Sequence, residues 1–423
     1  MSQRRVVITG IGVVAPGGLG AKAFWERIVA GTPMTRLITA FDSTDFRSRI
    51  AAECDFDPFQ YGFSEHDIGR LDRAALFALT ATREAMSDSG LVVDRDDAHR
   101  VGVSLGTAVG ATLRLEERYR AVSHEGRDWL VDHRLAGPDL YDYFVPSSMA
   151  AEVAWAAGAE GPNAVVSAGC TSGIDAVGHA WDLIRDGSVD MMIAGATDAP
   201  IAPITVACFD AIKATSNTND DPGTAARPFD RTRNGFVLGE GSAVLVLEEL
   251  QSARRRDAHI YAEIRGYASR GNAFHMTGLR PDGQEMAAAI RAALDTARIP
   301  ATAVDYVNAH GTATRQNDRH ETQALKRGLG MHAYDVPISS IKPVIGHSLG
   351  AVGAIEVAAS AMAIEFDVVP PTANLHHPDA ELDLDYVPRE ARQRKLSTVL
   401  TVGSGFGGFQ SAIVLSAPEA VAA

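Results

Sequence analysis

The sequence predicts a protein of the α/β class, and two observations support this prediction. Short runs rich in β-branched residues alternate with amphipathic or alanine-rich stretches, as strands alternate with helices in α/β proteins. The composition is that of a large globular protein, with 46% hydrophobic and 22% charged residues among 423. We therefore expect a large buried core without a long disordered region.

The predicted elements follow one another from the N-terminus. Strands are expected at residues 5–9, 101–105, 164–167 and 191–194, and helices at residues 22–30, 72–89 and 171–185. The helix at 72–89 is the clearest, because apolar side chains recur at helical spacing and Gly90 follows as a C-terminal cap. The apolar stretch 349–366 contains Glu356 and Glu365, so it predicts a buried helix rather than a membrane span.

Two sequence features recur and predict two related halves. In the first, a predicted strand ends in a Gly-Thr corner, at residues 101–107 and again at residues 305–312. In the second, a Gly-rich turn begins a predicted strand, at residues 239–247 and again at residues 405–415. We expect an N-terminal half of residues 1–255 and a C-terminal half of residues 256–423. Residues 121–148 fit neither pattern and are expected to form an inserted cap or interface element.

Charge and cysteine usage exclude several functions. The chain has 39 Lys and Arg against 53 Asp and Glu, and a net charge of -14 disfavours binding to nucleic acid or to an anionic membrane. Cys54, Cys170 and Cys208 lie far apart without a C-x-x-C pair, which indicates neither a disulfide framework nor a zinc site. We expect the cytoplasm, a reducing compartment.

The motif Gly10-x-Gly12-x-x-Ala15 imitates part of a dinucleotide-binding fingerprint. That fingerprint requires a helix to begin at the glycine-rich turn, so that the helix N-terminus faces the pyrophosphate. Here Pro-Gly-Gly follows, and no helical pattern begins before about residue 21. We therefore do not expect a dinucleotide at this position.

Cys170 lies where a predicted strand turns into a predicted helix. The N–H groups and dipole of a helix N-terminus lower the pKa of a cysteine thiol. Gly169 and Gly173 permit a strained backbone and a close approach of substrate. Cys170 is thus a candidate nucleophile, although a buried cysteine with only a packing role fits the same context.

Two histidines and one turn add further candidates. His310 and His347 each lie beside glycine near the end of an apolar run. A single histidine beside a glycine at the end of an apolar run is more often structural. Two such histidines, together with a cysteine at a strand-to-helix turn, favour a catalytic role. The Gly-Phe-Gly-Gly turn at Phe406 predicts either a flexible hairpin or a backbone N–H directed at a substrate oxygen.

Together these motifs resemble a known family. Cys170-Thr-Ser-Gly, His310-Gly-Thr-Ala-Thr, Lys342 five residues before His347, and the Gly-Phe-Gly-Gly turn are similar to the β-ketoacyl-acyl carrier protein synthases of the thiolase-like superfamily. Within it, the segments 207–215, 314–321 and 408–412 most resemble the ketosynthase alpha subunits of type II polyketide synthases. Ala313 and Pro343 depart mildly from the family pattern, and neither removes a catalytic group.

The resemblance implies a fold and a reaction. The thiolase-like fold has two pseudo-symmetric α/β halves that form an αβαβα layered sandwich. The reaction is a decarboxylative Claisen condensation of malonyl carrier protein with an acyl chain on Cys170, and it needs no metal or organic cofactor. Backbone N–H groups of Cys170 and Phe406 would hold the acyl oxyanion, while His310 and His347 would hold the enolate oxygen.

The resemblance also implies supporting residues and partners. Lys342, in contact with Glu356, would stay charged and keep at least one imidazole neutral. Three threonines match positions that bind the pantetheine amides: Thr277, Thr312 and Thr314. Arg70 and Lys213 are candidates for contact with an acidic acyl carrier protein, although ordinary solvated charges explain both equally well. The expected second partner is a chain-length-factor (ketosynthase beta) subunit in a heterodimer.

Two alternative functions stay open at this point. A homodimeric fatty-acid elongating synthase has the same catalytic set, and it would be active without a second subunit. A non-catalytic partner subunit is disfavoured by the retention of Cys170, His310, Lys342 and His347. The small residues at 107–112 predict either a roomy acyl channel or close backbone packing.

Overall fold

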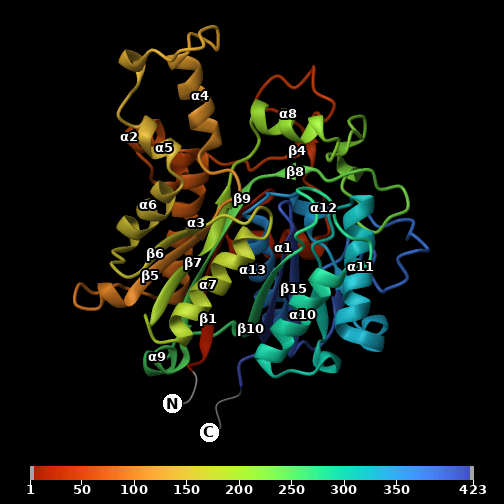
Figure 1. Cartoon of the computed structure of the whole chain (residues 1–423). Coiled ribbons are helices and arrows are strands. Elements are labelled where there is room, and N and C mark those ends of the chain that lie inside the picture. The colour runs from red at the N-terminus through yellow and green to blue at the C-terminus, as the bar shows by residue number, and fades with distance from the viewer. Residues whose placement is uncertain (1–3, 420–423) are drawn as a thin grey trace.

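The structure, a computed structural model, describes residues 4–419 and confirms the predicted α/β class. Its largest sheet has eleven strands (Figure 1). Five belong to the N-terminal part: β1 (Val6–Ala15), β5 (Val101–Gly106), β6 (Asn163–Val166), β7 (Met191–Asp198) and β9 (Gly241–Glu249). Five belong to the C-terminal part: β10 (Ala262–Gly271), β11 (Tyr306–Asn308), β12 (Ile338–Ser339), β15 (Thr398–Gly405) and β16 (Phe409–Ser416). The last, β2 (Gly18–Leu19), pairs with β1.

The two groups of strands have the same topology. The order is β1-β9-β7-β5-β6 in one group and β10-β16-β15-β11-β12 in the other. In each, the first two neighbouring pairs are antiparallel and the last two are parallel. A short antiparallel pairing of β1 with β10 joins the groups. The two sequence features that recur lie on equivalent strands, β5 with β11 and β9 with β16.

Helices complete the five layers that the resemblance implied. The outer layer against the first group contains α3 (Arg73–Ser89) and α6 (Ser147–Ala157), and the outer layer against the second contains α10 (Gln284–Ala297) and α11 (Arg315–Leu329). The central layer contains α7 (Ser172–Arg185) and α13 (Val352–Phe366), which pack on each other and on strands of both groups. As predicted, Gly90 ends α3 in the left-handed conformation.

Shorter elements connect these layers. The helices are α1 (Ala21–Ala30), α2 (Glu65–Arg70), α4 (Thr112–Val122), α5 (Leu140–Phe144), α8 (Pro203–Ala211), α9 (Leu250–Arg255) and α12 (Lys342–Ile345). The strands are β3 (Arg36–Leu37), β4 (Ile50–Ala52), β8 (Leu238–Gly239), β13 (Val368–Val369) and β14 (Arg392–Gln393). Residues 4–419 contain no helix long and apolar enough to cross a membrane.

The segment that fits neither half projects from the body of the protein (Figure 1). It contains α4 and α5, which contact each other. The helix α4 that leads into it begins at Thr112, directly after the small residues at 107–111.

The glycines of the imitated dinucleotide fingerprint have a packing role. Strand β1 runs through the whole motif to Ala15, so no helix begins there. A Cβ atom on Gly12 would lie 1.9 Å from the carbonyl oxygen of Ala81 in α3, and one on Gly10 would lie 2.2 Å from that of Ala85. The two glycines therefore allow α3 to lie directly against the strand.

Candidate active site

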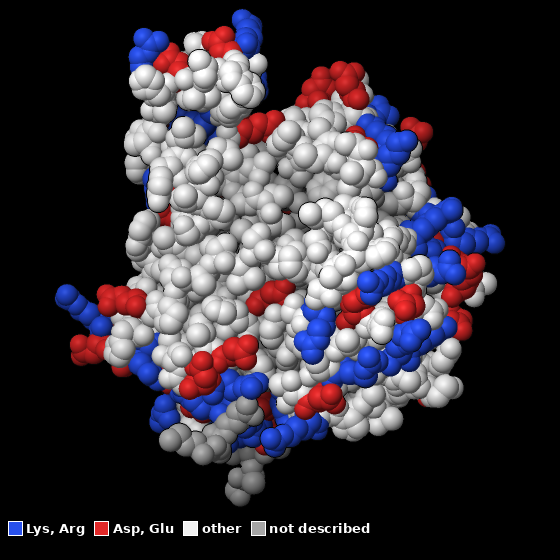
Figure 2. Space-filling model, viewed as in Figure 1, with Lys and Arg blue, Asp and Glu red and all other residues white. Residues whose placement is uncertain are grey.

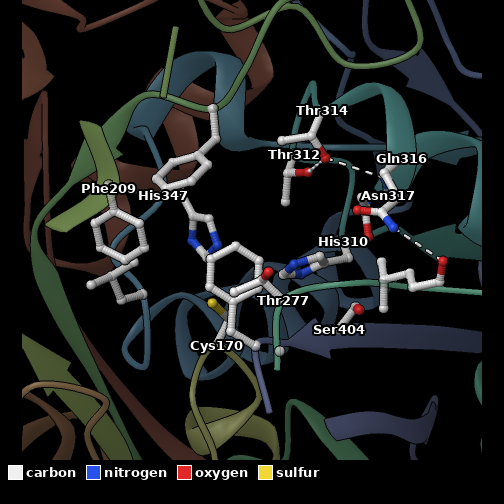
Figure 3. A pocket seen from close by; sticks show the side chains of 15 residues that line it. Cys170, Phe209, Thr277, His310, Thr312, Thr314, Gln316, Asn317, His347 and Ser404 are labelled. Carbon is white, nitrogen blue, oxygen red and sulfur yellow. Dashed lines mark hydrogen bonds between the residues drawn. The ribbon is translucent and has the colours of Figure 1, made fainter. Parts of the chain in front are cut away.

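Four turns from different parts of the chain meet at one small cavity of about 50 Å³ (Figure 3). Cys170 lies between β6 and α7, His310 after β11, His347 after α12, and Phe406 between β15 and β16. The lining residues are Cys170, Phe209, Phe236, Thr277, Leu279, His310, Thr312, Thr314, Gln316, Asn317, His347, Leu349, Ser404, Gly405 and Phe406. The structure therefore brings together the predicted nucleophile, both histidines and the predicted oxyanion turn.

The turn at Cys170 is built against the turn at Phe406. Gly169 has a φ of 58°, and a Cβ atom on it would lie 2.8 Å from the Phe406 carbonyl oxygen. A Cβ atom on Gly405 would lie 3.1 Å from the backbone nitrogen of Cys170. Only glycine permits this approach of the two turns. Gly173, which we expected to make room for substrate, instead allows contact with α13, where its Cβ would lie 2.3 Å from the nitrogen of Ala354.

The pKa of Cys170 differs from the sequence-based expectation. The thiol touches the cavity but lies deep in the protein, and burial raises its pKa to about 11. The backbone N–H of Phe406 and the charge of Lys342 act in the opposite direction without cancelling the cost of desolvation. The thiol is therefore protonated at neutral pH, and the lowered pKa expected from the helix start is not found.

The two histidines face each other across the cavity. Their ring centroids are 5.4 Å apart and their planes are nearly perpendicular, at 85°. The backbone N–H of His347 donates to Val237, and its carbonyl accepts from Gly239, which fixes the turn that carries it. Burial lowers the pKa of both imidazoles well below the usual value, and the nearby Lys342 lowers it further. Both rings are therefore neutral at pH 7.

Lys342 is buried beneath the histidines. Its ammonium group donates to the backbone carbonyl of His310 and to a carboxylate oxygen of Glu356, so the predicted Lys342–Glu356 contact is present. Glu356 is fully buried, and burial raises its pKa to about 7 while the lysine opposes this shift. The lysine fixes the backbone of His310 rather than its ring.

Sequence reasoning missed a second buried carboxylate. Glu321 in α11 accepts the backbone N–H groups of His310 at 2.6 Å and Gly311 at 2.8 Å. Glu321 thus binds N–H groups of the turn after β11, whereas Lys342 binds the carbonyl of His310 in the same turn. In the sequence, helical periodicity indicates only that Glu321 faces inward. That it binds the backbone of His310, eleven residues earlier, is seen only in the structure. Phe209 of α8 also lines the cavity, and no sequence pattern predicted this position.

The three threonines lie together along the cavity towards a wider outer pocket. Thr312 and Thr314 share a hydrogen bond of 3.0 Å between their hydroxyl groups, and Thr277 lies on a neighbouring loop. Thr277 and Thr314 also line the outer pocket of about 460 Å³, together with Lys213 and Arg315. This arrangement is a channel from the protein surface to Cys170.

The two candidate carrier-protein contacts have different surroundings. Lys213 lines the outer pocket, and its ammonium group makes no hydrogen bond or ion pair with any of residues 4–419. Arg70 lines neither pocket, and its guanidinium makes a two-pronged ion pair with Glu152. The structure therefore brings Lys213 to the mouth of the site and does not bring Arg70 there.

Comparison with known proteins identifies the family. Residues 3–253 match the "Beta-ketoacyl synthase, N-terminal domain" family and residues 261–376 match the "Beta-ketoacyl synthase, C-terminal domain" family. The protein belongs to the β-ketoacyl synthase family, as its motifs predicted.

The curated relatives include ketosynthase alpha subunits at high identity. The chain is 63% identical over 418 residues to the tetracenomycin polyketide synthase ketoacyl synthase alpha subunit of Streptomyces glaucescens, covering 99% of this chain and 98% of that one. It is 59% identical to the actinorhodin polyketide putative beta-ketoacyl synthase 1 of Streptomyces coelicolor, covering 100% and 90%. The 3-oxoacyl-[acyl-carrier-protein] synthase 2 of Coxiella burnetii is 40% identical, covering 98% and 99%. The predicted alpha-subunit class is confirmed.

Solved structures of related complexes have the same fold as this chain. A chain of the AntDE:AntF complex, in which a type II polyketide synthase acyl-carrier protein is bound to its ketosynthase, matches with a TM-score of 0.92 and 38% identity, covering 99% of this chain and 100% of that one. The ishigamide ketosynthase/chain length factor matches with a TM-score of 0.88 and 31% identity, covering 99% and 100%. The thiolase-like fold that the resemblance implied is confirmed.

The raised pKa of Cys170 predicts how its alkylation depends on pH. Only the thiolate reacts with iodoacetamide, so labelling should accelerate about tenfold per pH unit from pH 7 to 10, without a plateau near neutrality. Peptide mass spectrometry separates Cys170 from the exposed Cys208, and Cys170→Ala provides the background. A labelling rate that levels off below pH 8 would contradict the raised pKa.

Proposed function

We propose that this ketosynthase alpha subunit extends a polyketide chain that is bound as a thioester to Cys170, using malonyl units delivered by an acyl carrier protein. The observation that carries the proposal is the meeting of Cys170, His310, His347 and the Phe406 turn at the inner end of one channel. The channel narrows from an outer pocket to a thiol, which suits a pantetheine arm that carries a thioester at its tip.

The first step transfers the acyl chain to the cysteine. Because the Cys170 thiol rests protonated and both imidazoles are neutral, one ring can accept its proton as the sulfur attacks the carrier's thioester. The oxyanion that forms lies between the N–H groups of Cys170 and Phe406, whose turns are held together by Gly169 and Gly405. The pantetheine thiol then leaves with the proton.

The second step forms the new carbon–carbon bond. Malonyl carrier protein loses carbon dioxide, and neutral imidazoles donate hydrogen bonds to the enolate oxygen that develops. The enolate carbon attacks the acyl thioester and the Cys170 sulfur leaves. Loss of one such donor costs roughly 3–4 kcal/mol of transition-state stabilisation. Decarboxylation itself supplies the carbanion, so we propose that no metal or organic cofactor takes part.

Intact-mass spectrometry tests both steps. Wild-type protein incubated with an acyl carrier protein thioester should gain the mass of the acyl group, and Cys170→Ala should gain none. His310→Ala should still be acylated but should release carbon dioxide from malonyl carrier protein at least 100-fold more slowly. Chelator should change neither rate. An adduct that persists in Cys170→Ala would contradict the assignment of the nucleophile.

We propose that Lys213 contacts the acidic carrier protein at the mouth of the channel. Lys213→Glu should raise the KM for malonyl carrier protein several-fold and leave kcat nearly unchanged, because a rim charge acts mainly on encounter. The effect should fade as salt is added. Lys22→Glu is the matched control, since Lys22 is also an exposed lysine and lines a different pocket. An equal rise of KM in both variants would contradict the proposed contact.

A chain-length-factor subunit is the second partner that we propose, on the face beside β6. This strand ends the sheet and is partly exposed, so its outer backbone groups can pair with another strand. Tyr141, Phe144 and Trp155 nearby are each at least 70% exposed. Figure 2 shows that this side of the molecule is largely free of charged side chains. Large uncharged patches of this kind are typical of permanent interfaces.

Co-expression with the neighbouring subunit tests this interface. Trp155→Glu should abolish co-purification of the partner and prevent chain extension, because it buries a charge in the interface. Met331→Glu should leave the pair intact, since Met331 is equally exposed but belongs to the C-terminal part. A wild-type protein that is an active homodimer without a second subunit would instead support the fatty-acid elongating alternative.

The cytoplasm is the compartment we propose. Cys54, Cys170 and Cys208 are free thiols, and Cys170 must stay reduced to accept an acyl group. Fractionation of cells that produce the protein tests this location, and recovery in a secreted fraction would contradict it.

A further inference from the structure

A buried carboxylate that the mechanism above does not use lies behind the cavity. Asp198 ends β7 and is completely buried. One of its oxygens accepts hydrogen bonds from the Thr107 hydroxyl at 2.7 Å and the Val109 N–H at 3.2 Å. The other accepts from the N–H groups of Ala108 at 2.9 Å and Gly350 at 2.7 Å. All four partners donate, so the site is built for an ionised carboxylate.

The four donors belong to two loops that come from different parts of the chain. Thr107, Ala108 and Val109 follow β5, whereas Gly350 lies three residues after His347. Both loops reach the cavity region, because Ala108, Val109 and Leu349 pack in one apolar cluster with Cys170. Asp198 therefore ties the loop beside the acyl-accepting cysteine to the loop that carries a histidine.

The loop after β5 is also tied to the turn of the nucleophile. The Thr107 N–H donates to the carbonyl of Val166 in β6 at 3.1 Å. The Ser172 hydroxyl shares its proton between the carbonyls of Gly169 at 2.6 Å and Thr107 at 3.2 Å, and it accepts from the N–H of Ala168 at 2.9 Å. At the other loop, a Cβ atom on Gly350 would lie 2.6 Å from Asp198 and 2.4 Å from the nitrogen of Ala108. The junction is closely packed at this point, so a shift of either loop stretches or breaks some of the four bonds.

The free volume beside Cys170 is small. About 50 Å³ is far below the roughly 300 Å³ or more of typical ligand pockets, so an acyl chain longer than a few atoms requires wall residues to move. Leu349 lines the cavity directly, and Ala108 and Val109 support the same cluster. These are the residues that the Asp198 bonds hold in place.

We propose that Asp198 is a positioning residue that sets the acyl-chain preference of the Cys170 pocket by holding the loops of Val109 and Leu349 against it. The proposal rests on the proposed function, because it concerns the chain that Cys170 accepts. With the carboxylate intact, a longer chain must displace these two walls against the four hydrogen bonds, which lowers its acylation rate relative to that of a short chain. When the bonds are lost, the walls recede and the penalty against a long chain decreases.

Asp198→Asn tests the proposal with little change in side-chain size. An amide offers one acceptor oxygen, and its NH₂ group would face backbone N–H donors, so at least two of the four bonds are lost. The measurement is the rate of Cys170 acylation by acetyl and by octanoyl pantetheine thioesters, followed by intact mass. The octanoyl-to-acetyl rate ratio should rise about tenfold, because part of the free energy of the lost bonds no longer opposes displacement of the walls. A ratio is independent of the fraction of protein that is folded.

Controls separate positioning from general destabilisation. Asp230→Asn removes a buried carboxylate that also accepts four hydrogen bonds, from Thr232, His376 and His377, but lies outside the pocket, and it should leave the ratio unchanged. If Asp198→Asn does not fold, Thr107→Val removes one donor and should raise the ratio by a smaller factor.

Two results would overturn the proposal. One is an Asp198→Asn protein that acylates with both thioesters at rates reduced by the same factor. The other is an unchanged ratio in a folded Thr107→Val protein. A wild-type protein that is not acylated at Cys170 would instead contradict the proposed function itself.

Discussion

The active site depends on a backbone contact between two helices, α7 and α13, at the centre of the molecule. Gly173 and Gly353 leave no side chain at the crossing, so the nitrogen of Ala354 lies where a Cβ atom of residue 173 would otherwise be. Each helix follows one of the functional turns, and the close crossing brings Cys170 and His347 to one cavity. A larger side chain at either glycine would separate the nucleophile from the histidine that serves it.

The electrostatics of the site follow from burial. Removal of water raises the pKa of the Cys170 thiol and lowers that of both imidazoles, so the resting site contains a thiol and two neutral rings. The charged groups nearby, Lys342 and Glu356, neutralise each other below the rings. Such a buried pair contributes little net stability, but removing one partner leaves a charge without compensation. In this site, the Lys342–Glu356 pair fixes the backbone of His310 through Lys342 and leaves the His310 imidazole neutral.

Local sequence signals predicted the elements and the candidate residues, because these depend on neighbours in the chain. The helix ending at Gly90 and the recurring strand features are set by periodicity and by turn residues. Properties set by distant groups were not predictable. Glu321 and Asp198 act on turns far from them in sequence, and the pKa of Cys170 depends on burial, which outweighs its local helix start. Gly173 was misread for the same reason, since its partner lies on α13.

The matching strand order of the two halves gives the site a division of labour. The ends of β5 and β6 lead to the acyl-side loop at Thr107 and to the nucleophile, whereas the ends of their counterparts β11 and β12 lead to His310 and, through α12, to His347. In the proposed mechanism, the first repeat supplies the cysteine that carries the growing chain, and the second supplies the two histidines that act on the malonyl group. Because Leu349 and Phe406 of the second repeat also line the cavity, a change of chain preference can arise in either repeat, whereas both histidines belong to the second repeat alone.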